Sequence, residues 1–130
     1  MPRILVVEDD PAIRDLLAEL LAMFAYRTDT AENGAVALER MAQAVPDAVL
    51  LDMMMPVMDG PAFIAACQHN PAWAVVPIIL MTAAVDFAIS RDLPVQAILR
   101  KPFDADDVLG VVRRLTDRGA RNPAPNLSEA

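Results

Sequence analysis

Short apolar runs alternate with segments of helical periodicity along most of this chain. Runs that are rich in valine, isoleucine and leucine, with few polar interruptions, are typical of strands buried on both faces of a sheet. Such runs occupy residues 3–7, 47–51, 76–81 and 95–99, and a weaker one occupies residues 27–30. The pattern therefore predicts five strands.

Five helices are expected between and after these strands. Asp10 is a favourable cap for a helix that begins at Pro11, where the missing N–H group has no cost. Apolar residues then recur every three or four positions up to Phe24, which is the spacing of one buried helix face. Further helices are expected after Asn33, from Gly60 until Asn70-Pro71, briefly within residues 85–91, and after Asp104.

Strands that alternate with helices predict an α/β fold in which a parallel sheet is covered by helices on both faces. The length of 130 residues fits one domain. We assign this domain to residues 1–118, and we expect the polar, proline-containing residues 119–130 to form a disordered tail or linker. Ligands of such sheets bind beyond the carboxyl ends of the strands, so functional residues are expected there.

Composition and charge narrow the range of partners. The chain has 18 acidic and 11 basic residues and a net charge of −7, which is a poor match for nucleic acid or an anionic membrane. A single cysteine excludes an internal disulfide and a cysteine-based zinc cluster. The longest mainly apolar stretch, residues 74–85, is too short to span a bilayer. Because no signal-peptide pattern is present, we expect a cytoplasmic protein.

Charged and polar residues follow the predicted strands. Glu8 and Asp9 follow the first strand, Asp52 the third, Thr82 the fourth and Lys101 the fifth. Because the carboxyl ends of parallel strands meet at one edge, these side chains are expected to lie together. Carboxylates this close repel one another, by about 4 kcal/mol per pair at 4 Å and an effective dielectric near 20. A proton or a bound divalent cation such as Mg²⁺ relieves that repulsion.

Four segments at these strand ends resemble the receiver domain of bacterial two-component response regulators. They read ILVVEDD at residues 4–10, DMMMPVMDG at 52–60, TA at 82–83 and KPF at 101–103. The resemblance covers roughly residues 2–118. It implies a flavodoxin-like, doubly wound sheet with the strand order 2-1-3-4-5. It also implies a cis peptide bond between Lys101 and Pro102.

The resemblance implies a role for each strand-end residue. Asp52 corresponds to the carboxylate that accepts a phosphoryl group from phosphohistidine. Thr82 and Lys101 correspond to the hydroxyl and the ammonium group that contact the phosphoryl oxygens. Such a set suits phosphoryl transfer, which needs an in-line nucleophile and positive charge around the equatorial oxygens.

A magnesium site is implied at the same edge. The ligands implied by the resemblance are the carboxylates of Glu8, Asp9 and Asp52 and the backbone carbonyl of Met54. Oxygen ligands of this kind suit Mg²⁺, which commonly binds one or two carboxylates together with a phosphate oxygen. No other cofactor is expected.

Two features depart from the family pattern. The position of the family's switch aromatic is occupied by Ile98, and the segment between Thr82 and Lys101 is shorter than usual, so the fourth helix should be short or irregular. The side chains of Met54 and Ala84, which flank the acceptor, offer no polar atom to hold an attacking water. A comparatively long-lived aspartyl phosphate is therefore expected.

The sequence predicts a signalling module and not a conventional enzyme. The expected partners are a sensor histidine kinase or a histidine phosphotransfer protein, and a downstream protein that binds the face of helix four, strand five and helix five. We expect no attached DNA-binding or enzymatic domain. One alternative is a receiver-like module that binds partners without phosphorylation. A less favoured alternative is a magnesium-dependent aspartyl phosphatase, which would need an acid at the position of Met54.

Overall fold

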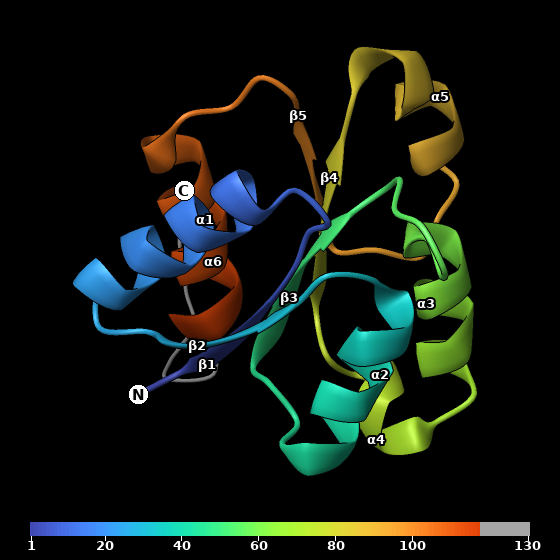
Figure 1. Cartoon of the computed structure of the whole chain (residues 1–130), viewed down its shortest axis with the longest axis horizontal. Coiled ribbons are helices and arrows are strands. Elements are labelled where there is room, and N and C mark those ends of the chain that lie inside the picture. Colours follow the sequence, from blue (N-terminus) through green and yellow to red (C-terminus); the bar gives the residue numbers. More distant parts are fainter. Residues whose placement is uncertain (118–130) are drawn as a thin grey trace.

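A computed structural model describes residues 1–117 of the chain. Its centre is a five-stranded parallel sheet with the strand order β2-β1-β3-β4-β5 (Figure 1). The predicted α/β architecture and strand order are therefore confirmed. The strands are β1 (Arg3–Val7), β2 (Arg27–Ala31), β3 (Ala48–Asp52), β4 (Ile78–Thr82) and β5 (Ala97–Arg100).

Helices cover both faces of this sheet. Figure 1 shows α1 and α6 on one side and α2, α3, α4 and α5 on the other. These helices are α1 (Pro11–Met23), α2 (Gly34–Gln43), α3 (Gly60–Gln68), α4 (Pro71–Ala74), α5 (Phe87–Ser90) and α6 (Ala105–Asp117), and a 3₁₀ turn, η1 (Ala84–Asp86), precedes α5. No helix within residues 1–117 is long and apolar enough to cross a membrane.

Two hydrophobic clusters lie on opposite faces of the sheet because successive strand side chains point to opposite sides. In β1, Leu5 and Val7 pack in one cluster with residues of α2 and α3, whereas Ile4 and Val6 pack in the other with residues of α1 and α6. All of β3 and β4 is buried, as expected for strands covered on both faces. The covered sheet holds the ends of its strands in fixed relative positions.

The helix count differs from the prediction of five. Asn70-Pro71 was expected only to end the third helix, but it also begins the short α4. The side chain of Asn70 accepts a hydrogen bond from the Ala72 N–H, and Pro71 takes the first helical position, where proline is favoured. Trp73 consequently lies within α4 and packs against the core. The expected short fourth helix is present as η1 and α5, and the proposed tail lies outside the described residues.

Strands β4 and β5 begin two residues later than the apolar pattern predicts. The side-chain oxygen of Gln96 accepts the N–H of Ile78, and the Gln96 N–H donates to the Ile78 carbonyl. The Gln96 side chain thus takes up the Ile78 N–H, and Pro77 before it has no N–H to donate. The regular pairing therefore starts at Ile79 opposite Ala97.

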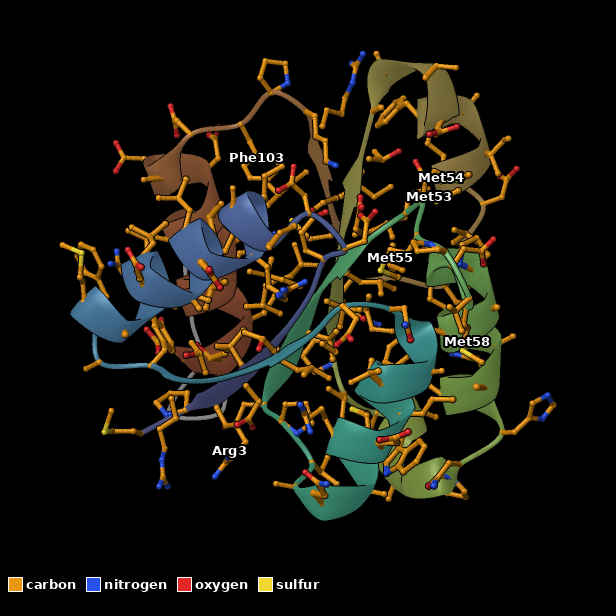
Figure 2. All side chains as sticks on the ribbon, in the orientation of Figure 1. Arg3, Met53, Met54, Met55, Met58 and Phe103 are labelled. Atoms are coloured by element: carbon orange, nitrogen blue, oxygen red, sulfur yellow. The ribbon has the colours of Figure 1, made fainter. Side chains whose placement is uncertain are left out.

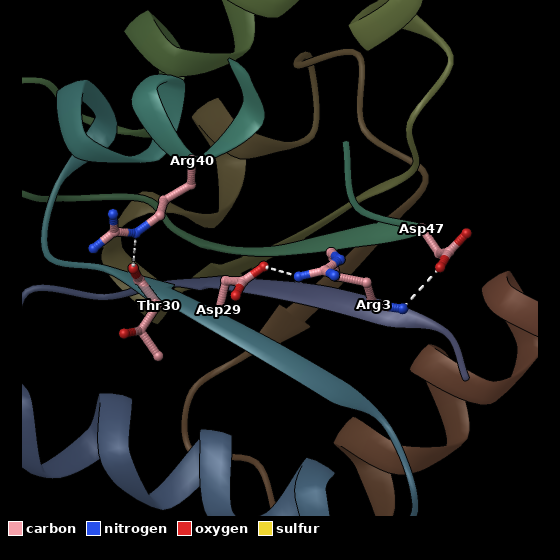
Figure 3. Close-up of polar contacts among 5 residues, drawn as sticks. All are labelled: Arg3, Asp29, Thr30, Arg40 and Asp47. Carbon is pink, nitrogen blue, oxygen red and sulfur yellow. Dashed lines mark hydrogen bonds and ion pairs between the residues drawn. The ribbon is translucent and has the colours of Figure 1, made fainter. Parts of the chain in front are cut away.

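Polar contacts tie β1 to β2 and to the start of β3, and tie α2 to β2 (Figure 3). The Arg3 guanidinium contacts the Asp29 carboxylate of β2 at 2.7 Å, and the Arg3 backbone N–H donates to the Asp47 side chain just before β3. The Arg40 side chain of α2 donates to the Thr30 carbonyl. The Arg3–Asp29 pair is partly exposed and adds little stability by itself, but the bonds set the register of three neighbouring strands.

Gly60 allows α3 to begin directly against the end of β3. A Cβ atom placed on Gly60 would lie 2.8 Å from the backbone oxygen of Asp52 and 3.0 Å from that of Met53. The Gly60 N–H donates to the same Met53 carbonyl. The loop of residues 53–59 is therefore closed tightly behind Asp52.

Replacing Gly60 tests this close approach. We expect Gly60→Ala to lower the free energy of unfolding by about 1–3 kcal/mol, because backbone atoms have to move to admit the methyl group. Gly110→Ala is the matched control, since nothing lies within 4 Å of a Cβ atom there and α6 should gain about 0.5–1 kcal/mol. Urea unfolding measures both, and equal effects would contradict the packing argument.

Candidate functional site

The strand register brings the acidic residues to one edge of the sheet. Asp52 is the last residue of β3, and Val7 of β1 pairs with Leu51, so Glu8 follows β1 at the level of Asp52. Both side chains are buried, with residue exposures of 2% for Glu8 and 5% for Asp52. Asp9 is exposed next to them.

Glu8 is held by the turn into α1. Its N–H donates to the carbonyl of Ala31, and its Oε2 accepts the backbone N–H of Asp10 at 3.2 Å. The Asp10 side chain in turn accepts the N–H groups of Ala12 and Ile13, which confirms its predicted role as the helix cap. The acidic pair, Glu8 and Asp9, and the helix cap Asp10 are thus consecutive residues.

Three carboxylates lie close enough to share a cation. One oxygen each from Glu8, Asp9 and Asp52 lies within 4.8 Å of the others. Among residues 1–117, Oε1 of Glu8 is buried without a hydrogen-bond partner. An unpaired buried carboxylate oxygen is costly unless it binds a proton or a cation. The donor set and this orphaned oxygen fit a hard divalent cation such as Mg²⁺.

Lys101 supplies the positive charge of the site. Its Nζ lies 3.0 Å from Oδ1 of Asp52, and the Lys101 side chain is one-third exposed. Its backbone N–H donates to the carbonyl of Thr82, which fixes the end of β5 against the end of β4. The following Lys101–Pro102 peptide bond is cis, as the resemblance implied.

Burial governs the protonation of this cluster. Desolvation raises the pKa of Glu8 to about 7, and the charge of Asp52 adds to the rise. Desolvation also raises the pKa of Asp52, although the hydrogen bond from Lys101 opposes the rise. Burial alone would lower the pKa of Lys101, but its contacts with Asp52 outweigh this effect and leave the pKa raised. The lysine therefore stays charged, while Glu8 titrates near neutral pH.

Of the two remaining predicted residues, Thr82 is placed by the register of β4, and Met54 lies in the loop after β3. Thr82 is fully buried at the end of β4, one residue beyond Met81, which pairs with Asp52. Its hydroxyl donates to the neighbouring Ala83 carbonyl. Met54 is 58% exposed in the loop after β3. In Figure 2 it lies on the same side of the sheet as α5, away from Phe103.

Comparison with known families decides the identity of this arrangement. The response regulator receiver domain model matches residues 4–113. The chain belongs to the receiver domain family. Receiver domains are signalling modules, so the predicted functional class is confirmed at this level.

Relatives of this receiver domain include whole regulators and parts of kinases. The chain is 35% identical over 126 residues to the DNA-binding dual master transcriptional regulator RpaA of Synechocystis, with 95% of this chain and 52% of that protein covered. It is 36% identical over 117 residues to the sensor histidine kinase TmoS of Ectopseudomonas mendocina, with 88% of this chain and 12% of that protein covered. The chain thus spans about half the length of the first relative and a small part of the second.

A solved receiver domain has the same fold. It belongs to the sensor histidine kinase PA1611 of Pseudomonas aeruginosa, and its structure has a magnesium ion coordinated in the active site cleft. The similarity has a TM-score of 0.82 at 26% identity and covers 88% of this chain and 97% of that one.

Sequence reasoning missed two contacts of the site. The Asp10 N–H that binds Glu8 could have been expected, because it follows from the cap geometry. Arg14, whose Nη1 donates to the carbonyl of Glu8 at 3.0 Å, was not singled out. Its only signal in the sequence is a basic residue in the first turn of a helix, where a basic residue is disfavoured.

The raised pKa of Glu8 predicts a pH-dependent stability of the metal-free protein. Between pH 4.5 and about 7 the folded state binds more protons at Glu8 than the unfolded state, so the free energy of unfolding falls as the pH rises through this window. We expect Glu8→Gln to reduce this fall by about 1–3 kcal/mol, with Asp52 retaining an effect of the same sign.

Urea unfolding at pH 5 and pH 8 in the presence of a chelator measures the difference. Glu39→Gln, at an exposed position of α2, is the matched control and should follow the wild type. A pH dependence that is identical in wild type and Glu8→Gln would show that Glu8 does not titrate in this window.

Proposed function

We propose that this receiver domain accepts a phosphoryl group on Asp52 from a phosphohistidine and passes the signal on by phosphorylation-dependent binding or relay. The observation that carries the proposal is the buried Asp52 carboxylate, held 3.0 Å from Lys101 and grouped with Glu8 and Asp9. A structural ion pair would not need two further carboxylates beside it.

The chemistry follows from these groups. One carboxylate oxygen of Asp52 forms a bond to phosphorus while the bond from phosphorus to the histidine nitrogen breaks, so the imidazole leaves and an acyl phosphate remains. Lys101 donates to the charge that spreads over the phosphoryl oxygens, and we assign the same task to the Thr82 hydroxyl. The low exposure of Asp52 limits competition from water.

Magnesium fits this site. Glu8, Asp9, Asp52 and the Met54 carbonyl would hold it, since three of these ligands already group within 4.8 Å. When bound, the ion supplies positive charge that offsets the carboxylates and the phosphoryl oxygens. The chain's own contribution is to keep Glu8 oriented through the Asp10 N–H and Asp52 oriented through Lys101.

The phosphodonor we propose is a sensor histidine kinase or a histidine phosphotransfer protein in the cytoplasm. An apolar groove of about 270 Å³ opens beside Lys101. This groove lies between α1 and the segment that follows β5, and Leu16 of α1, which is 65% exposed, lines it. An apolar helix of the donor that packs there would bring its histidine close to Asp52.

The downstream partner is proposed to bind the face of α5, β5 and α6. Two exposed apolar residues, Val85 and Ile89, lie in η1 and α5. Ile98 of β5 packs partly against the core and has no hydroxyl, so an aromatic switch cannot operate there. The Arg100 guanidinium instead lies 4.4 Å from the centre of the Phe87 ring and connects β5 to α5.

The two alternatives have less support. A phosphorylation-independent module would not need Asp52, Lys101 and the acidic pair to be assembled in one buried site. A phosphatase would need a general acid two residues after the nucleophile, and that residue is the exposed Met54.

Phosphorylation by a small donor tests the proposal directly. With acetyl phosphate and Mg²⁺, we expect mass spectrometry to show a gain of one phosphoryl group that disappears in Asp52→Asn. Asp10→Asn is the matched control, because it changes the same functional group at the helix cap and should still be phosphorylated. No mass gain in the wild type, or a gain that persists in Asp52→Asn, would overturn the assignment.

The residues around Asp52 predict a slow loss of the phosphoryl group. The side chains of Met54 and Ala84 are exposed and have no polar atom to hold an attacking water. We expect the double variant Met54→Asn, Ala84→Glu to shorten the lifetime of the aspartyl phosphate by about tenfold or more. Phosphate release after donor removal measures it, with Met23→Asn as an exposed control. An unchanged rate would exclude this account of the lifetime.

A further inference from the structure

Arg14 occupies a position that local helix preferences disfavour. It lies in the first turn of α1, and its backbone N–H donates to the Asp10 carbonyl at 2.9 Å. The amino end of a helix carries partial positive charge, so a cation there is unfavourable. A residue that breaks a local rule calls for a compensating interaction elsewhere.

That interaction is a hydrogen bond to the acidic pair's backbone. Nη1 of Arg14 donates to the Glu8 carbonyl at 3.0 Å, six residues back along the chain. Helical side chains tilt toward the amino end of their helix, so a long side chain in the first turn of α1 reaches back over the cap to the end of β1. Arg14 is partly buried in this position.

The orientation of the Glu8 carbonyl affects the geometry of the site. The β1 ladder ends at Val7, which pairs with Ala31 and Leu51, so Glu8 lies just beyond the regular pairing of the sheet. The peptide unit that contains this carbonyl links Glu8 to Asp9. Its orientation therefore affects where both carboxylates point.

We propose that Arg14 is a positioning residue for the cation site: by fixing the Glu8 carbonyl, its guanidinium orients the Glu8 and Asp9 carboxylates to bind a divalent cation. The inference rests on the proposed function in one respect, namely that the acidic cluster binds Mg²⁺. Partners that hold metal ligands in place typically contribute 10–100-fold to metal affinity.

A role of Arg14 as a nearby charge and a role as a positioning residue predict opposite changes in cation affinity when Arg14 is removed. If Arg14 acted only as a nearby positive charge, its removal would tighten the binding of a cation. If it orients the ligands, its removal weakens binding. We expect Arg14→Met, which keeps a long aliphatic chain but no donor, to raise the Kd for Mg²⁺ about tenfold. Arg14→Lys, which keeps a donor and the charge, should recover most of the affinity.

The experiment is a calorimetric Mg²⁺ titration of the unphosphorylated protein at pH 8, together with the Mg²⁺-induced rise in Tm. Arg27→Met is the matched control, because it removes one exposed positive charge at the opposite edge of the sheet and should leave the Kd unchanged. Arg14→Leu, which also has no donor, replaces Arg14→Met if the latter does not fold. The Tm of the metal-free variants separates a loss of folding from a loss of binding.

The outcomes separate this inference from the proposed function. If the wild type binds Mg²⁺ and Arg14→Met binds it equally or more tightly, the positioning role is overturned and the proposed function stays intact. No Mg²⁺ binding by the wild type overturns the metal site itself and the role of Arg14 with it. A weaker Kd for Arg14→Met with recovery in Arg14→Lys supports the proposal.

Discussion

Repulsion among carboxylates at one edge of the sheet is the constraint on which the site depends. Glu8, Asp9 and Asp52 contribute one oxygen each to a region less than 5 Å across, and two of the three side chains are almost inaccessible to water. Lys101 balances only part of this charge through Asp52. The remainder has to be met by a proton on Glu8 or by a cation, so the fold holds its acidic cluster in a state that favours the arrival of positive charge.

The opposite edge of the sheet has the reverse character. There the Arg3 guanidinium pairs with Asp29 and the Asp47 carboxylate accepts the Arg3 backbone N–H, and these bonds join strands that must keep their register. The same parallel sheet thus has a satisfied edge that stabilises the register and an unsatisfied edge that is suited to chemistry.

Much of this could be predicted from the sequence, because the pattern of apolar runs and strand-end acids is local. The order of the strands and the roles of Asp52 and Lys101 needed the resemblance, whereas the strand-end positions alone predicted that these two residues, 49 positions apart, lie at the same edge. Two features were not predicted for physical reasons. Asn70-Pro71 satisfies the rules for ending one helix and for beginning another. Arg14 contacts the backbone carbonyl of Glu8. Every residue type has such a carbonyl, so the sequence gives no sign of this contact.

The position of Trp73 affects how this protein can be studied by spectroscopy. It is the only tryptophan in the chain and lies in α4, which directly precedes β4 at the amino edge of the sheet. A chromophore there is separated from Asp52 by the length of a strand, so an ion at the acidic cluster cannot quench its emission by contact. A change in the wavelength or intensity of Trp73 emission on phosphorylation would therefore signal a rearrangement transmitted through the core from Asp52 to α4.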